Sequence, residues 1–511
     1  MSSLNEFGQN LINEVELANR FNKVNNKKGT RSTKSASALA LAYERARNAV
    51  EYRDEHLIRQ AAIERILKRR LFLNQSTQKI ANLLIKELTW ARYVESENIE
   101  KTKIDKFKDI IQKYREAGLL IPNNKHSNSL VGLCACEIDE ILNFNPINQI
   151  VINFVSSSLE KVIEFEETDK VTKSIQVYIA TERSFAKNSE ILIKYKLLKV
   201  LLPKWTDATV LLSTLDKIDD HLNYKYKDAI RRKVGQISPP FNLIRDLVVE
   251  HGEKLKNLSE DKEGLKNKIE EVLDQKYSET KSKVLRASKR SIVYIFLTKM
   301  ILAMLIEIPF DIILGSVNYL VLSINILFPP ALMILFNSRV KLPEGNNSIL
   351  ITEKVFDYLY SRPEELQKEN IKTSGEKGTM EKIFYYTFLS TSILVVLGII
   401  TLLNLLSFNF VNQIIFLFFL SVVSFFAFRV REVSNDYLMP ESQRDSFLET
   451  LLDYLFLPII KSGQWLSSQI SKINILSFIF DFIIEAPLKT FLEIFEQWLH
   501  FVRVKKEEFL G

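Results

Sequence analysis

A stretch of 46 residues, 383–428, contains no charged side chain. As a single helix, with a rise of about 1.5 Å per residue, it would be about 69 Å long, more than twice the hydrocarbon thickness of a bilayer, about 30 Å. Its middle, residues 404–412, contains three asparagines and a serine, which are polar groups suited to a turn at a membrane surface. We therefore predict that 383–428 forms a transmembrane hairpin and that the chain is a multi-pass integral membrane protein.

Two further apolar segments precede this hairpin. Residues 291–314 and 317–336 are separated by Gly315 and Ser316, so we predict a first transmembrane hairpin over 291–338. Both segments are interrupted: the first carries Lys, Glu, Pro and Asp, and the second carries two asparagines and a Pro-Pro pair. One full span followed by a re-entrant segment is therefore an alternative to two spans.

Basic side chains flank the open ends of both predicted hairpins but are absent from the hairpin turns. Neither hairpin turn carries Lys or Arg, whereas residues 339–382 hold eight. The positive-inside rule then predicts four spans with both termini in the cytoplasm, in a bacterial-type inner membrane. We expect the flanking cations to contact anionic lipid. They are Lys281, Lys283, Arg286, Lys289 and Arg290 before the first span, and Arg429 and Arg431 after the last.

The polar regions indicate an all-α fold, because they show helical patterning with few Gly and Pro. From the breaks in this pattern we predict a flexible basic tail at 1–38, an N-terminal helical domain at 39–121, a loop or linker at 122–149, a second helical block at 150–240, a coiled-coil stalk with a basic juxtamembrane segment at 241–290, and a cytoplasmic loop at 339–382. The stalk is inferred from a seam formed by Leu255, Leu258, Leu265, Ile269 and Val272. The polar, acidic first residues contain no apolar segment, so we expect no cleavable secretory signal.

The C-terminal region, 429–511, has intermediate hydrophobicity. Its apolar segments, 447–460 and 473–484, are too short to span a bilayer. Tryptophans at 465 and 498 and interspersed lysines favour amphipathic helices in the headgroup region or packed against the bundle. Embedding of 447–500 in the membrane is the alternative.

Three ionisable residues interrupt the first span. Lys299, Glu307 and Asp311 are eight and four residues apart, which places them within one half of a helix circumference. Such charges commonly line a water-filled path, which would indicate transport. Alternatively, Lys299 extends toward the cytoplasm while the two acids lie near the outer surface. We favour this second arrangement because the other spans carry no charge.

Glu485 is a further candidate. Residues 483–489 share Glu and Pro at equal spacing with residues 305–311, as duplicated transporter elements do. The shared pattern is short, and apolar helices with a proline are common in membrane proteins, so chance similarity is favoured over a true repeat.

Residues 1–80 hold 15 basic and 8 acidic side chains, which accounts for the net charge of +7. Eight of the basic residues lie between 45 and 70. They spread around most of a helix and alternate with acids, so nucleic-acid binding is disfavoured. Attraction to anionic lipid, or to a partner protein, fits this distribution better.

The sequence gives little support for a metal site or a catalytic site. The two cysteines, Cys134 and Cys136, have a single histidine nearby, His126, so a tetrahedral zinc site would lack ligands. A phosphate-binding glycine loop, a nucleophile elbow and a His-Glu-x-x-His motif are not found in the sequence. We expect no enzyme activity and no cofactor.

These features favour a non-enzymatic membrane scaffold or assembly protein whose cytoplasmic helices bind a protein partner. A homo-oligomer is an alternative partner arrangement. A transporter or channel subunit and a membrane-tethered nucleic-acid-binding protein are the alternative functions.

Overall fold

The computed structural model describes residues 4–25, 55–94, 101–120, 126–143, 145–165, 169–252, 254–313, 315, 317–338, 340, 343, 345–371, 379–442 and isolated positions or short runs from 450 to 505. The described chain is helical apart from one pair of two-residue strands, so the predicted all-α fold is confirmed. It divides into two compact units. Unit 1 comprises residues 1–12, 161–166 and 235–473, and unit 2 comprises the remainder.

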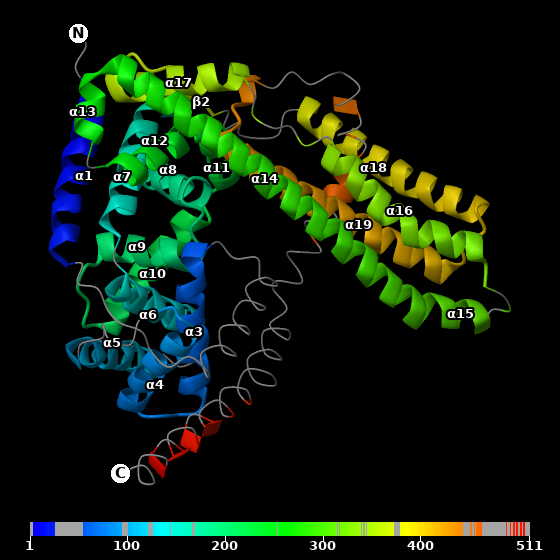
Figure 1. Cartoon of the computed structure of the whole chain (residues 1–511), viewed down its shortest axis with the longest axis horizontal. Coiled ribbons are helices and arrows are strands. Elements are labelled where there is room, and N and C mark those ends of the chain that lie inside the picture. The colour runs from blue at the N-terminus through cyan, green and yellow to red at the C-terminus, as the bar shows by residue number, and fades with distance from the viewer. Residues whose placement is uncertain are drawn as a thin grey trace. The chain divides into compact units, whose positions relative to one another are not determined.

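Unit 2 is a stack of amphipathic helices around one apolar core (Figure 1). Its helices are α3 (Glu55–Phe72), α4 (Thr77–Trp90), α5 (Lys101–Leu120), α6 (Ser127–Leu142), α7 (Pro146–Val162), α8 (Lys170–Ser184), α9 (Glu190–Leu201), α10 (Ala208–Leu222) and α11 (Lys227–Ile237), the last residues of α7 and α11 belonging to unit 1. Asp169 and Asp207 cap α8 and α10 by accepting hydrogen bonds from backbone amides of the first turn. Leu67, Leu84 and Phe107 are fully buried where α3, α4 and α5 meet.

The prediction that 122–149 is a loop or domain break is wrong over most of its length. Residues 127–142 form α6, which packs against α3, α5 and α9 in the core of unit 2. Leu130, Leu133 and Ile138 repeat at helical spacing and are buried. The asparagines at either end of the segment obscured this apolar run.

The flexible tail predicted for 1–38 also differs from the structure. Residues Glu6–Asn25 form helix α1, and its residues Leu11 and Ile12 are buried against α12 (Pro239–His251) and α17 (Gly345–Tyr360) in unit 1. The Asn5 side-chain amide donates hydrogen bonds to the backbone oxygens of Tyr358 (2.9 Å) and Ser361 (2.7 Å) and so attaches the start of this helix. Residues 26–38 lie outside the described part of the chain.

Unit 1 combines a polar helical layer with a bundle of apolar helices. Its elements are α12 (Pro239–His251), α13 (Leu255–Glu260), α14 (Lys262–Leu302), the π-helical segment η2 (Ala303–Glu307), α15 (Ile308–Ile313), α16 (Tyr319–Ser338), α17 (Gly345–Tyr360), α18 (Thr379–Leu405), α19 (Phe410–Ser434), the 3-10 turns η3 (Asn435–Tyr437) and η4 (Pro440–Ser442), and the parallel strands β1 (Ile163–Glu164) and β2 (Glu369–Asn370). Helices α14, α16 and α19 pack closely against one another, and buried Ile295, Met333 and Val423 lie in their shared core.

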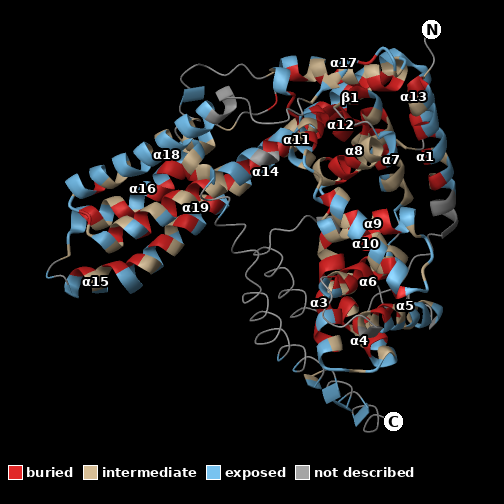
Figure 2. Cartoon of the chain, turned by 180° about the vertical axis from the view of Figure 1, so that it is seen from behind, coloured by how far each residue is buried: buried red, intermediate tan, exposed pale blue. Residues whose placement is uncertain are grey.

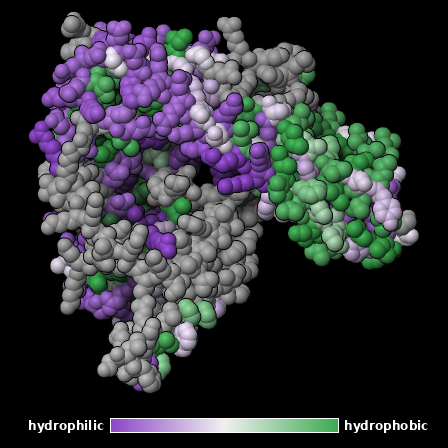
Figure 3. Space-filling model, viewed as in Figure 1, coloured by the Kyte–Doolittle hydropathy of each residue, from purple (hydrophilic) through white to green (hydrophobic). Residues whose placement is uncertain are grey.

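Four helices of the described chain are long and apolar enough to cross a membrane: 262–313, 319–338, 383–405 and 410–437. Short connections separate the first helix from the second and the third from the fourth, as expected from the sequence; their described residues are 315, 317–318 and 406–409. Gly315 and Ser407 adopt positive φ in these turns (113° and 62°). Figure 3 shows hydrophobic surface over these helices, and Figure 2 shows that α18 is largely exposed.

The expected coiled-coil seam is divided between two helices. Helix α13 ends at Glu260, and Asp261 then caps α14 by accepting a hydrogen bond from the Gly264 amide (3.0 Å). The apolar positions Leu265 and Ile269 are buried inside unit 1, where α14 contacts α12 and α17. A heptad-like spacing therefore marks the buried face of a helix within one chain. It is not the seam of a separate stalk.

Helix α14 continues without interruption from this polar layer into the apolar bundle. With η2 and α15 it makes one helical segment of 52 residues, about 78 Å long at 1.5 Å per residue. Its α-helical hydrogen bonding changes to π-helical at η2, which ends two residues before Pro309. Proline lacks an amide hydrogen and its ring displaces the carbonyl four residues earlier, so the preceding turn widens.

Candidate functional site

The apolar bundle encloses a set of polar side chains, which we call the buried polar cluster: the buried Lys299, Glu307, Asp311, Asn325 and Asn412, and the half-buried Asn409. At its centre the Lys299 Nζ donates a hydrogen bond to Glu307 Oε1 as an ion pair. Both side chains are 0% exposed. The expectation that Lys299 extends toward the cytoplasm is therefore wrong, because its ammonium is bound to a carboxylate eight residues further along the helix.

Neighbouring helices complete the surroundings of this ion pair. Asn325 on α16 donates through Nδ2 to Glu307 Oε2 at 2.9 Å, so both carboxylate oxygens accept a hydrogen bond. The Lys299 ammonium also lies 4.9 Å from the ring centroid of Phe419 on α19, a cation–π distance. The pair thus makes contacts with both helices that pack against α14.

The π-helical segment η2 explains how two residues of one helix can meet in this way. In an uninterrupted α-helix, positions eight residues apart lie about 80° apart around the axis. The amide of Ile308 instead bonds to the carbonyl of Ala303, five residues earlier, which puts an extra residue into the turn and reduces that offset. The side chain of Glu307 also leans toward the helix N-terminus, as helical side chains do, and so toward Lys299.

Asp311 joins the two hairpins near their turns. Its Oδ1 accepts hydrogen bonds from Nδ2 of Asn409 (2.5 Å) and Nδ2 of Asn412 (3.2 Å). Asp311 lies at the end of the first long helix, whereas Asn409 belongs to the turn that opens α19. The polar residues expected to face a membrane surface therefore bind a carboxylate from the other hairpin.

Two buried oxygen atoms in this cluster accept no hydrogen bond from any described residue: Asn325 Oδ1 and Asn412 Oδ1. Both residues are buried, at 0% and 2% exposure. A buried acceptor of this kind is costly, and a bound water is the usual way to satisfy it.

The seven predicted lipid-contacting cations are all exposed, in two groups on α14 and α19. The rings of Tyr294 and Phe426 pack with centroids 5.6 Å apart, which sets the level at which the two antiparallel helices meet. Arg290 precedes Tyr294 by about one turn and Arg429 follows Phe426 by about one turn, so both groups lie at the same end of the bundle.

The basic residues of the N-terminal helical region serve mainly as internal partners where they are described. Arg69 and Arg70 on α3 both bind the fully buried carboxylate of Glu87 on α4, and Arg59 pairs with Asp139 at 2.5 Å. A nucleic-acid surface needs exposed cations, so this part of α3 is unsuited to one. Arg45, Arg47, Arg53 and the candidate Glu485 lie outside the described residues.

The cysteine pair is buried in α6, and burial raises the pKa of both thiols. No three His, Cys, Asp or Glu side chains of the described residues come close enough to hold a metal ion. The Nε2 atom of His126 instead lies 3.0 Å from Asp216 Oδ1.

A second polar group, which we call the junction, connects the end of α19 to the polar layer of unit 1. Asn347 on α17 is 1% exposed and uses its whole amide: Nδ2 donates to the Tyr277 hydroxyl and the Tyr437 carbonyl (both 2.7 Å), and Oδ1 accepts from the Met439 amide (2.8 Å). Nearby, the Tyr437 hydroxyl donates to Asp246 on α12. The junction was not predicted from the sequence, because a lone asparagine on a helix gives no signal of its partners.

The ion pair generates a first prediction. Glu307→Gln leaves the Lys299 ammonium buried without its counter-ion, so we expect a loss of about 3–5 kcal/mol in unfolding free energy. The double variant Lys299→Leu, Glu307→Leu removes both charges and should lose clearly less than either single variant. Thermal unfolding of the full chain in detergent measures this. Equal losses in the single and double variants would contradict the pairing.

The buried carboxyl group of Asp246 predicts that the stability of the protein depends on pH. Burial raises the pKa of its carboxyl group, although the Tyr437 hydroxyl and Arg245 partly offset this effect. A raised folded-state pKa means that the contribution of Asp246 to stability is present at acidic pH and is lost as pH rises through that pKa. The stability of Asp246→Asn relative to the wild type should therefore increase as pH rises above the ordinary pKa of an aspartate, about 3.9. A difference in melting temperature that does not change with pH would contradict this.

Comparison of the chain with protein-family models, with curated proteins and with solved structures finds no match. The buried polar cluster, the junction and the apolar helices are the features of the chain that bear on its function.

Proposed function

We propose that the chain is an integral membrane protein whose two helical hairpins anchor a helical scaffold at the cytoplasmic membrane surface. One observation carries the membrane part: the bundle buries its charged side chains and exposes large apolar ones. On the same long helical segment, Leu297, Ile301 and Leu305 are more than half exposed, whereas Lys299 and Glu307 are fully buried. Water disfavours this pattern, and lipid hydrocarbon favours it.

The positions of the cations support the orientation in this proposal. Both basic groups lie at the end of the bundle opposite the two hairpin turns, and the turns contain no Lys or Arg. The positive-inside rule assigns such an end to the cytoplasm, where anionic headgroups attract it. Tyr385 and Tyr386, both exposed at the start of α18, suit the same interface.

Helix α14 supports the scaffold part of the proposal. It is continuous from the polar layer into the bundle, so it would fix the polar layer relative to the membrane. The junction adds a second attachment through the end of α19. A rigidly mounted helical surface is suited to binding a cytoplasmic protein partner, since little ordering entropy is lost on association.

Conduction of an ion is the second candidate function. The observation that favours it is the presence of three ionisable side chains and two buried amide oxygens without a described donor in one bundle. Against it, Lys299 and Glu307 neutralise each other, so neither charge is available to an ion without separating the pair.

Membrane insertion is tested on the full chain. We expect it to remain in vesicles after alkaline carbonate washing, because apolar helices are held by the hydrocarbon. A reporter after residue 511 and a reporter in the 406–409 turn should report opposite sides. Extraction by carbonate, or both reporters on one side, would exclude the proposal.

Scaffolding and conduction make opposite predictions for purified protein in sealed vesicles. We expect no proton or sodium flux above empty vesicles, and we expect cross-linking in native membranes to join unit 2 to one defined protein. A flux that is lost in Glu307→Gln, with Glu353→Gln as an exposed control, would establish conduction instead. Cross-links confined to lipid or to random neighbours would exclude a scaffold.

A further inference from the structure

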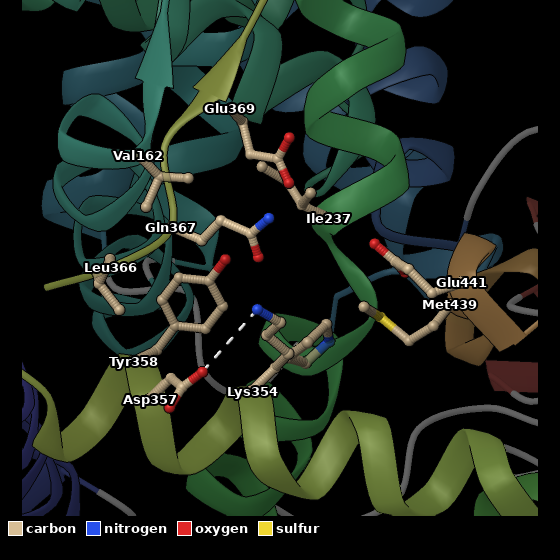
Figure 4. Close-up of a pocket in the computed structure, with 11 residues that line it drawn as sticks. Val162, Ile237, Lys354, Asp357, Tyr358, Leu366, Gln367, Glu369, Met439 and Glu441 are labelled. Atoms are coloured by element: carbon tan, nitrogen blue, oxygen red, sulfur yellow. Dashed lines mark ion pairs between the residues drawn. The ribbon is translucent and has the colours of Figure 1, made fainter.

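One carboxylate in the apolar bundle has no cation beside it. Asp311, in the last turn of α15, is 4% exposed and forms no ion pair with any residue that the structure describes. Glu307 in the same bundle binds Lys299, and Figure 4 shows an acid of the polar layer, Asp357, facing Lys354 at 3.9 Å. The buried polar cluster contains one cationic residue and two acidic ones, so it holds one negative charge in excess.

Hydrogen bonds and helix ends do not remove this charge. Asp311 Oδ1 accepts hydrogen bonds from Asn409 and Asn412, whereas Oδ2 accepts none from a described residue. Both asparagines lie at the start of α19, whose partial positive charge favours an anion. Asp311 itself lies at the end of the 52-residue helical segment, whose partial negative charge disfavours one. These two effects oppose each other, and a full negative charge remains on an almost fully buried carboxylate, which is costly.

The amide oxygen of Asn412 is a buried acceptor without a described donor beside this carboxylate. Asn412 is 2% exposed, and its Oδ1 accepts no hydrogen bond from any described residue. Its Nδ2 lies 3.2 Å from Asp311 Oδ1, and the two polar atoms of an amide are about 2.3 Å apart, so Asn412 Oδ1 lies within about 5.5 Å of the carboxylate. A water molecule would satisfy the amide oxygen, but it would leave the charge of Asp311 unbalanced.

We propose that Asp311 and Asn412 bind a monovalent alkali cation, with Asp311 Oδ2 and Asn412 Oδ1 as ligands, at the turn end of the bundle. Such an ion balances the excess charge of the buried polar cluster. A divalent cation would reverse that charge, and no three acidic or imidazole side chains of the described residues converge to ligate one. Carbonyl groups at the end of a helix supply further oxygen ligands of the kind that sodium-binding transporters use.

The position of the site gives the cation both access and a role. Asp311 lies two residues before the end of α15, so an ion reaches it from the end of the bundle without crossing the apolar core. Asp311 belongs to the first pair of apolar helices and Asn412 to the second. A cation held by both residues therefore joins the two pairs and stabilises the bundle, without any need for ion conduction.

Thermal unfolding of the full chain in neutral detergent tests the site. The midpoint is measured in sodium, potassium and choline chloride at equal ionic strength. We expect a saturable increase with sodium or potassium over choline, because a ligand of the native state raises its stability. Asp311→Asn should abolish the increase. Asn412→Ala should require about tenfold more cation for the same effect, as expected when one contact to a charged group is lost.

Asn325→Ala is the matched control. Asn325 is another buried asparagine whose Oδ1 has no described donor, but its amide binds Glu307 and not Asp311. This variant should lose stability and keep the cation response of the wild type. Equal wild-type midpoints in all three salts would overturn the proposal. So would a response that survives in Asp311→Asn, or one that is lost equally in Asn325→Ala. Because the measurement is made in detergent, failure of the cation site and failure of membrane insertion give separate results.

Discussion

An ion pair without access to solvent is the interaction on which the apolar bundle depends. Removing an ammonium and a carboxylate from water costs several kcal/mol for each ion, and the cost is recovered only with good geometry and further hydrogen bonds. Lys299 and Glu307 meet these conditions because Asn325 occupies the second carboxylate oxygen and Phe419 covers the ammonium. Packings of α14, α16 and α19 that move Asn325 or Phe419 away would leave the buried pair without these contacts, so the pair favours one arrangement among many that apolar contacts alone would permit.

The same logic extends to both ends of the bundle. Asp311 needs the two amides of the second hairpin, and Asn347 needs the backbone that follows α19. The hairpins are thus connected by polar contacts at the turns, at the centre and where the chain enters the polar layer. Helix α18 makes few such contacts and is largely exposed. Contacts within the protein therefore fix its position less firmly than they fix the positions of α14, α16 and α19.

The features that follow from average hydrophobicity were accessible from the sequence, and those that depend on helix phase or distant partners were not. The hairpin over 383–428 and its turn follow from length and the placement of polar residues. The partner of Lys299 could not be inferred from α-helical geometry, which places Glu307 about 80° around the helix axis from Lys299. Only the widened turn before Pro309 directs Glu307 toward Lys299. Helix α6 was missed because flanking asparagines dominated its window. Helix α1 was missed because polar residues separate its buried positions Leu11, Ile12, Val15 and Ala18 and lower its average hydrophobicity. Asn347 resembles an ordinary surface residue until the backbone places it.

The widened turn has a further consequence for the long helix as a whole. An ordinary α-helix carries a single stripe of buried positions that drifts steadily around its axis. Adding one residue within Ala303–Glu307 shifts the azimuth of everything beyond it in one step. The portion before the shift already packs against α16 and α19, and the shift keeps Glu307 and Asp311, which follow, among the buried residues of the same bundle. A helix too long for one steadily drifting stripe therefore keeps its last ionisable side chains directed inward.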